Sequence, residues 1–185
     1  GTDLSAYHPI SFTYDPALAP AHGELRDPNT LVQEVRLDRN QQLQCTACHD
    51  PHRDQYGNFL VKDNTASALC LECHVPNQWE TSVHATSSAT WNGNGQNPWP
   101  HTSGTTVAAN ACENCHRPHD AGTRPQLLNF VTEEQNCYSC HSGTVATKDI
   151  ASEFNKASVH PITQTSGIHT PNEDAINPPR HVECV

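Results

Sequence analysis

Cysteine and histidine recur in this chain in a fixed pattern, Cys-x-x-Cys-His, which can bind a large cofactor covalently. The pattern occurs four times and uses eight of the nine cysteines. In such a pattern two thiols bond to the edge of a porphyrin and the imidazole that follows binds its iron, so c-type haem is predicted. We therefore expect four haems c. The bonding cysteines are Cys45, Cys48, Cys70, Cys73, Cys112, Cys115, Cys137 and Cys140, and the proximal iron ligands are His49, His74, His116 and His141.

Zinc binding and disulfide bonds are the two other uses of paired cysteines. Structural zinc takes four ligands in a tetrahedron, so the cysteine pairs would have to combine two by two. Disulfides are common in exported chains and would also use eight cysteines. Neither explains the histidine that follows every second cysteine, and the complete pattern favours haem.

The motifs repeat at a constant offset, which indicates a duplicated unit. Cys45 and Cys112 are 67 positions apart, and so are Cys70 and Cys137. A lone histidine precedes each pair in a similar context, at intervals of 76 positions, at His8, His84 and His160. The sequence predicts a two-haem unit at residues 1–79, a second at 80–157, and the start of a third unit or a C-terminal extension at 158–185.

The last residues, His181-Val182-Glu183-Cys184-Val185, look like the opening of another haem motif. An odd cysteine in an exported chain otherwise needs a partner. We expect that Cys184 begins a fifth haem site that is cut off here, with a lone terminal thiol as the alternative. The first residues show no basic and apolar leader, which is typical of a mature exported form.

Each iron needs a second ligand on its open face. The chain has no methionine, which excludes His/Met ligation, and nine histidines remain after the proximal ligands are assigned. Bis-histidine sites are therefore expected. The distal ligands would be His8, His52, His84 and His119, with His160 and His181 as further candidates, while His22, His101 and His169 have no assigned role.

The spacing of His52 and His119 limits which irons they can bind. Each follows a proximal histidine by three residues and leaves the chain on nearly the same side. Because two axial ligands approach an iron from opposite faces, neither can serve the haem beside it. The expected pairing gives His52 to the haem of residues 70–74 and His119 to that of residues 137–141. The first haem of each unit is then served by His8 and His84, and adjacent haems would lie nearly in contact.

Composition points to a fold without an ordinary core. Only 35% of the 185 residues are hydrophobic, four are Phe, and 14 are Pro. A chain of this kind stays disordered or takes its core from another source, and apolar macrocycles can be that source. We expect a mostly irregular fold with a few short helices and minimal strand, organised around a haem stack.

A few local structures are predicted. Thr132-Glu133-Glu134-Gln135 has the form of a capping box, which predicts a short helix that runs to His141. The equivalent Thr65-Ala66-Ser67 predicts a helix that reaches His74. Asn92-Gly93-Asn94-Gly95 predicts turns, and residues 31–37 are the one stretch with strand-like alternation. Three tryptophans are expected to pack on haem faces: Trp79, Trp91 and Trp99.

Net charge narrows the class of partner. The formal charge is −10, and two propionates on each of four haems would bring it to about −18 at neutral pH. This argues against nucleic acid and is compatible with a cationic redox protein, a mineral surface, or a solvated surface without a partner. No run of eighteen apolar residues occurs, so no membrane span is expected.

With these motifs the chain resembles the multihaem c-type cytochromes of the doubled CxxCH class. The resemblance rests on the paired motifs, on Cys-x-x-Cys-His-x-Pro-His, on residues 3–12 and on residues 180–184. It implies export to the cell surface, the extracellular space or the periplasm, because bacteria complete covalent haem attachment outside the cytoplasm. Relatives serve anaerobic respiration in metal-reducing bacteria. Some polymerise into extracellular filaments in which a histidine of one subunit completes a haem of the next, so a homo-oligomer is among the expected partners.

The expected function is electron transfer to external acceptors through a row of bis-histidine haems, without enzyme activity. The alternative is a multihaem reductase, which needs one iron with an open face. Enzymes of that class often replace an attachment histidine. All four motifs here keep it, and no lysine follows any second cysteine, which favours conduction.

Overall fold

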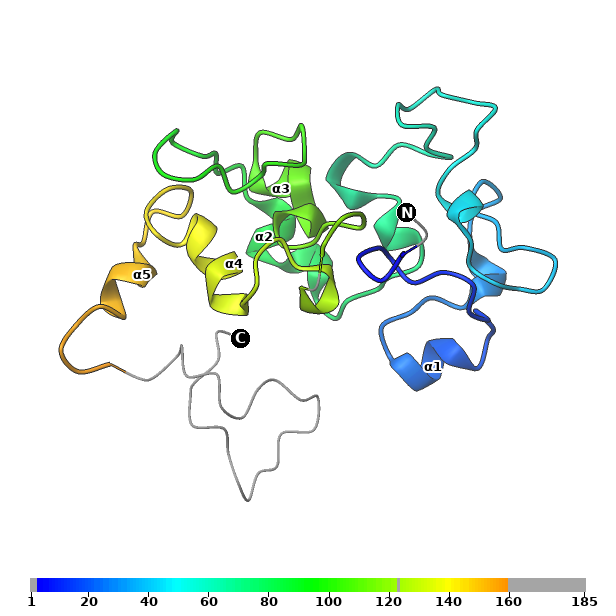
Figure 1. The fold of residues 1–185 in the computed structure, drawn as a ribbon, viewed down its shortest axis with the longest axis horizontal. Helices are drawn as coiled ribbons and strands as arrows, with labels where there is room; N and C mark the ends of the chain where they lie inside the picture. The colour runs from blue at the N-terminus through cyan, green and yellow to red at the C-terminus, as the bar shows by residue number, and fades with distance from the viewer. Residues whose placement is uncertain (1–2, 123, 160–185) are drawn as a thin grey trace, which may run out of the picture.

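Irregular backbone connects short helices in the computed structural model, which describes residues 3–122 and 124–159 (Figure 1). The α-helices are α1 (Leu18–His22), α2 (Val83–Thr86), α3 (Val107–Asn110), α4 (Glu133–Cys140) and α5 (Ile150–Glu153). The 3₁₀ helices are η1 (Pro28–Thr30), η2 (Cys45–Ala47), η3 (Thr65–Ser67), η4 (Cys70–Glu72), η5 (Trp79–Thr81), η6 (Ala111–Asn114) and η7 (Pro125–Leu127). Within these residues extended pairing consists of isolated bridges without a strand. The expected fold class is confirmed, while the haem stack stays a prediction.

Part of the chain lies beyond this description. His160, His169, His181 and Cys184 are outside the described residues, and so is most of the expected third unit. None of the described helices has both the length and the apolar character needed to cross a membrane.

Apolar packing is thin along the described chain. Its buried apolar residues are Tyr14, Ala19, Val35, Leu43, Ala47, Leu69, Trp99, Val107, Ala111, Ala121 and Leu128. Several large apolar side chains remain open to solvent, with Val83 75% exposed and Val131 67% exposed. Short helices with so little buried area gain little from tertiary packing, the main source of helix stability in proteins.

The helix predicted from the capping box is confirmed as α4. Thr132 Oγ1 accepts from the backbone N–H of Gln135 at 3.4 Å, and the Gln135 side chain accepts from the Thr132 N–H at 3.4 Å. Two N–H groups at the helix start are thereby satisfied. The helix ends at Cys140 and presents His141 directly after its last turn.

The helix predicted from Thr65 to His74 is wrong. η3 and η4 are separate turns there, because Ala66 and Ser67 have φ values of 53° and 58° in the left-handed region. This backbone lets Ser67 Oγ donate to Asn110 O at 3.1 Å and accept from Cys112 N–H at 3.0 Å. A tertiary contact between the two motif pairs therefore replaces the expected helix.

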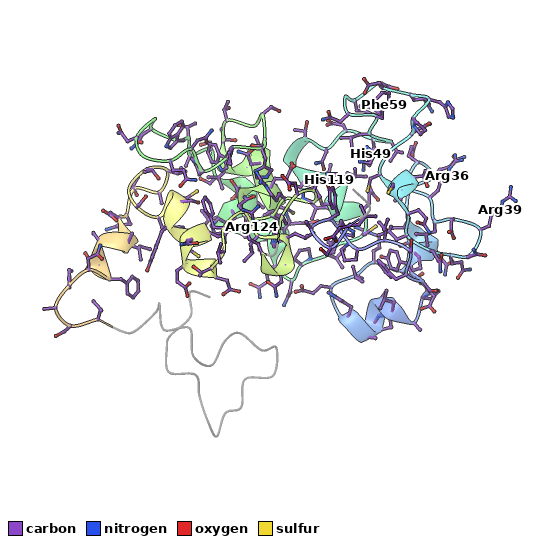
Figure 2. All side chains as sticks on the ribbon, viewed as in Figure 1. Arg36, Arg39, His49, Phe59, His119 and Arg124 are labelled. Atoms are coloured by element: carbon purple, nitrogen blue, oxygen red, sulfur yellow. The ribbon has the colours of Figure 1, made fainter. Side chains whose placement is uncertain are left out.

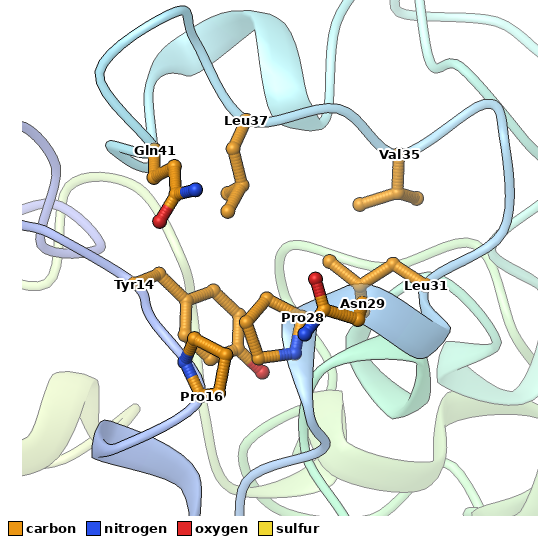
Figure 3. A pocket seen from close by; sticks show the side chains of 8 residues that line it. All are labelled: Tyr14, Pro16, Pro28, Asn29, Leu31, Val35, Leu37 and Gln41. Atoms are coloured by element: carbon orange, nitrogen blue, oxygen red, sulfur yellow. The ribbon is translucent and has the colours of Figure 1, made fainter.

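Residues 31–37 do not form a strand either. They wind around a pocket of about 170 Å³ that faces Tyr14 and Pro16 (Figure 3). Leu31, Val35 and Leu37 line this pocket, so their alternation reflects a loop folded over Tyr14. The predicted turns around Asn92 are present, since Gly93 and Gly95 have φ values of 84° and 69°.

Two contacts fasten the N-terminal segment to the middle of the chain. His8 N–H donates to Pro118 O at 2.8 Å, and Ala121 N–H donates to Ala6 O at 2.8 Å. The N-terminal segment consequently lies in the centre of the molecule, although α1 lies at its edge (Figure 1). Residues 6–8 and 118–121 together are called the N-terminal clasp below.

Candidate haem-binding sites

All four Cys-x-x-Cys-His motifs fold into the same tight turn. The backbone N–H of each histidine donates to the carbonyl of the first cysteine, at 3.0 Å for His49, 2.9 Å for His74, 3.0 Å for His116 and 2.9 Å for His141. This turn brings two thiols and one imidazole to a short stretch of backbone. The sequence-predicted attachment residues are therefore arranged alike at each motif, whether the motif lies in a 3₁₀ helix or at the end of α4.

A returning segment orients the first histidine of each pair. His49 Nδ1 lies 2.8 Å from Asn58 O, and His116 Nδ1 lies 2.9 Å from Gln126 O. A carbonyl oxygen only accepts, so Nδ1 is the donor and carries the proton. The other nitrogen, Nε2, is left with a lone pair for a metal, and the hydrogen bond fixes the ring.

The second motif of the first pair is held by residues 24–26. Arg26 N–H donates to Cys73 O at 2.8 Å, and the Arg26 guanidinium donates to the carbonyls of Glu72 and Leu71 at 2.9 and 3.2 Å. Tyr14 Oη donates to Arg26 O at 2.5 Å and supports this arrangement. In the second pair α5 has this role, because Ile150 N–H donates to His141 O at 2.8 Å.

Three proximal histidines each face a second imidazole. The ring centres are 6.1 Å apart for His8 and His74, 5.8 Å for His49 and His119, and 6.3 Å for His84 and His141. Metal–imidazole bonds are about 2 Å long and a ring centre lies about 1 Å beyond its nitrogen, so two rings on opposite sides of one ion have centres about 6 Å apart. The rings present therefore fit haem iron with two axial imidazoles.

These pairs differ from the pairing expected from the sequence. His119 lies beside His49 and not beside His141, while His8 and His84 lie beside the second proximal histidine of their pairs. The exclusion of the neighbouring haem stays a prediction, and the ring contact of His119 is with His49. The rings are placed this way because the clasp brings residues 118–121 back to the first motif pair, which spacing along the chain does not reveal.

The remaining histidines of the described part are placed differently. His52 and His22 are exposed and their rings have no imidazole partner among the described residues; the same holds for the ring of His116. His101 Nε2 donates to His116 O at 3.1 Å. That bond occupies the nitrogen that most often binds a metal, so His101 serves as a hydrogen-bond donor to the backbone of the third motif.

The thiols of successive motifs lie close enough to affect one another. Burial, and then the nearby Cys48, raise the pKa of the Cys73 thiol to about 11. A hydrogen bond from the Cys70 thiol lowers the pKa of Cys112 to about 7 and raises that of Cys70. Burial, followed by Cys140, raises the pKa of Cys115 to about 11. The four motifs are thus neighbours in space in their sequence order.

Zinc, the alternative use of the cysteines, would need several ligands gathered around one compact ion. In residues 3–122 and 124–159 no three side chains among His, Cys, Asp and Glu gather in a group that could hold a metal ion. The arrangement found is pairs of imidazole rings whose centres lie 5.8 to 6.3 Å apart, each pair containing the histidine of one motif.

Comparison with known proteins gives one match. Residues 39–78 and residues 105–146 each match the family model of the doubled CXXCH motif. No curated protein and no solved structure matches the chain. The two matched segments contain all four motifs and both turns with a fixed proximal ring, and they identify the chain as a multihaem c-type cytochrome of the doubled CxxCH class.

Proposed function

We propose that this cytochrome conducts electrons through four haems c, one on each Cys-x-x-Cys-His motif, without converting a substrate. The three imidazole pairs carry this proposal. A haem c supplies a one-electron redox centre when bound. At the three paired motifs, two imidazoles on one iron would leave no position for a substrate, and hydrogen bonds such as that of His49 Nδ1 hold the rings in place.

A closely packed row of haems is supported by the contacts between successive motifs. The Cys70 and Cys112 side chains are neighbours, and Ser67 bonds to both Asn110 and Cys112. These contacts join the second motif to the third. Attachment sites this close favour transfer of electrons along the chain of motifs instead of exchange at four isolated centres.

Export and an extracellular acceptor are part of the same proposal. The c-type haem motifs support a role outside the cytoplasm, at the cell surface, in the extracellular space or in the periplasm, because bacteria attach this haem after export. The net charge of −10 favours cationic redox partners, which would be steered by the acidic surface. Respiration to external acceptors is a setting that fits a protein with several redox centres.

Assembly into a filament is supported by two imidazole rings that have no imidazole partner among the described residues. His52 is the counterpart of His119, yet it is exposed and its ring is unpaired within the described residues, as is the ring of His116. If His52 of one copy approached His116 of another, the contact would be heterologous and could continue without closing. Imaging of the purified protein tests this: His52→Ala should shorten or abolish filaments, and wild-type protein that stays monomeric at high concentration would refute assembly.

One observation favours the reductase alternative, namely that the proximal ring of His116 has no imidazole partner among the described residues. An iron with an open face at this motif could bind a small substrate. Electron paramagnetic resonance of the oxidised protein separates the two functions. Conduction predicts low-spin ferric signals from all haems, whereas a persistent high-spin signal from a quarter of the iron in every assembly state would favour the reductase.

The haem content itself is tested by mass and absorbance. The intact protein should weigh more than its polypeptide by four haems, and the pyridine haemochrome spectrum should be that of thioether-bonded haem. A colourless protein with the mass of the polypeptide would refute the proposed function.

A further inference from the structure

We infer that the haem bonded to Cys45 and Cys48 takes its distal ligand from the other motif pair, namely His119. The two motif pairs would then share a haem site and form one redox unit. The inference rests on the proposed function only in requiring that haem is bound.

The first support is the geometry of the two rings. Their centres are 5.8 Å apart with planes tilted by 49°, and Figure 2 shows His119 and His49 lying near each other although they belong to different motif pairs. His49 Nδ1 is committed to Asn58 O, so Nε2 is the nitrogen that remains for a metal. The ring pair thus has the spacing of two axial ligands, and one of the two rings has a fixed orientation.

The second support is the clasp that positions His119. Pro118 O accepts from His8 N–H and Ala121 N–H donates to Ala6 O, both at 2.8 Å, so the backbone on either side of His119 is fixed to the N-terminal segment. The ring of Tyr7 then packs edge-on against the His119 ring at 5.7 Å. His119 is held away from its own motif and towards the first motif pair.

The same clasp carries a second ligand. His8 lies on it, and the His8 ring is 6.1 Å from that of His74. The N-terminal clasp therefore places His119 beside the first motif and His8 beside the second motif. Tyr7, between them in the fold, is a positioning residue. Its loss should loosen His119 without removing a ligand.

The test counts high-spin haems in variants of the full chain. His119→Ala should convert one of four irons to high spin in otherwise unchanged protein. In a Cys45→Ala/Cys48→Ala background, which lacks that haem, His119→Ala should create no new high-spin iron. In a Cys137→Ala/Cys140→Ala background it should still create one. The opposite pattern in the two backgrounds would overturn the inference.

Two controls make the result decisive. His22→Ala removes an exposed histidine whose ring has no imidazole partner among the described residues, and it should add no high-spin iron to that of the wild type. Tyr7→Ala should give a partial high-spin fraction that rises with temperature, while Tyr7→Phe should behave as wild type because the ring contact remains. A merely structural Tyr7 would give low-spin iron in both variants.

A measurement on the wild-type protein replaces any cysteine-pair variant that folds poorly. In oxidised wild-type protein, hyperfine-shifted methyl signals of the haem bonded to Cys45 and Cys48 should show nuclear Overhauser contacts to the His119 ring. Contacts from His119 to the haem of Cys137 and Cys140 would overturn the inference. A haem-loaded protein that fails here still leaves electron transfer intact, whereas a protein without haem would refute the proposed function itself.

Discussion

The two motif pairs, residues 45–74 and 112–141, share a backbone design but are packed by different chemistry. In both, a loop returns to the first motif by the same bonds, from Val61 N–H to Cys48 O and from Asn129 N–H to Cys115 O. The residues before each return have positive φ values, as at Asn58 and Gln126. The proximal ring is therefore oriented by the same device in each pair.

The buried side chains around this device differ in kind. Positions at the repeat offset carry an apolar residue in the first pair and an asparagine in the second: Leu43 and Asn110, Ala47 and Asn114, Leu69 and Asn136. Each asparagine donates to backbone carbonyls, as Asn114 Nδ2 does to Val107 O at 2.8 Å and Ala111 O at 2.6 Å. The first pair is packed by apolar contact and the second by amides that satisfy loop carbonyls.

This difference shows that the haem-binding turn does not depend on how its surroundings are packed. The turn needs its own hydrogen bond and a carbonyl for Nδ1, and both kinds of packing supply them. The two motif pairs thus form the same turn although different kinds of side chain pack around it. Exchanging residues between the pairs should reveal which kind of packing each pair tolerates.

Asn110→Leu should have the largest effect, because it gives the second pair the residue of the first. Asn110 is buried, donates to Gly104 O and Thr106 O at 3.1 and 3.0 Å, and accepts from Thr102 Oγ1 at 2.5 Å. Loss of these bonds should lower the free energy of unfolding by about 2–4 kcal/mol. Guanidinium unfolding of the haem-loaded protein, followed by circular dichroism, measures it.

The matched control is Asn40→Leu on the exposed surface, which should change stability by less than about 0.5 kcal/mol. An Asn110→Leu protein as stable as wild type would show that the second pair accepts apolar packing, and the contrast between the pairs would disappear.

Gly104→Ala tests the same network from its other side. A β-carbon at this position would meet the Asn110 side chain well inside van der Waals contact, and overpacking of this kind costs about 1–3 kcal/mol. Thermal unfolding should show a lower midpoint. The Gly104→Ala/Asn110→Ala double variant should lose less stability than the two single variants combined. Additive losses of stability would argue against a direct clash between the two side chains.

Thr132→Ala and Thr65→Ala compare the start of the second motif in each pair. Thr132 caps α4 and its removal should cost about 1 kcal/mol. Thr65 caps no helix, since its hydroxyl donates to Asp63 Oδ1 in an exposed turn, so its removal should cost less than about 0.5 kcal/mol. If chemical unfolding shows equal losses of stability for the two variants, Thr65 and Thr132 have the same capping role in solution.

Glu113→Gln should have the smallest effect and a pH dependence. Burial raises the pKa of the half-buried Glu113 carboxyl, so the folded state favours its protonated form. Stability from this group is then present at low pH and is lost as pH rises from its unfolded pKa through its raised folded pKa. At neutral pH Glu113→Gln should raise the free energy of unfolding by at most about 0.5 kcal/mol, because solvent screens the group. At pH 4 it should not raise the free energy of unfolding. A larger gain at pH 4 than at pH 7 would contradict the direction of the shift.

Sequence patterns predicted local structure correctly where the hydrogen bonds that form it join residues only a few positions apart. The capping box at Thr132 gave α4, and the turns at Asn92 are present, because both depend on neighbours in the chain. The helix expected at Thr65 failed because Ala68 stands where the capping box has Gln135, and Ser67 is drawn into contact with Asn110. The same cap position thus leads to different structures in the two pairs.

The sequence by itself determined the haem motifs, their number and order, and the tight turn at each, because these depend on residues at most four positions apart. Only the tertiary structure decided which histidines face one another. His119 reaches His49 and His8 reaches His74 through the N-terminal clasp, whose backbone bonds join segments more than a hundred positions apart. Spacing limits which face of a haem a nearby histidine can reach, but the position of a distant ring depends on how the intervening chain folds.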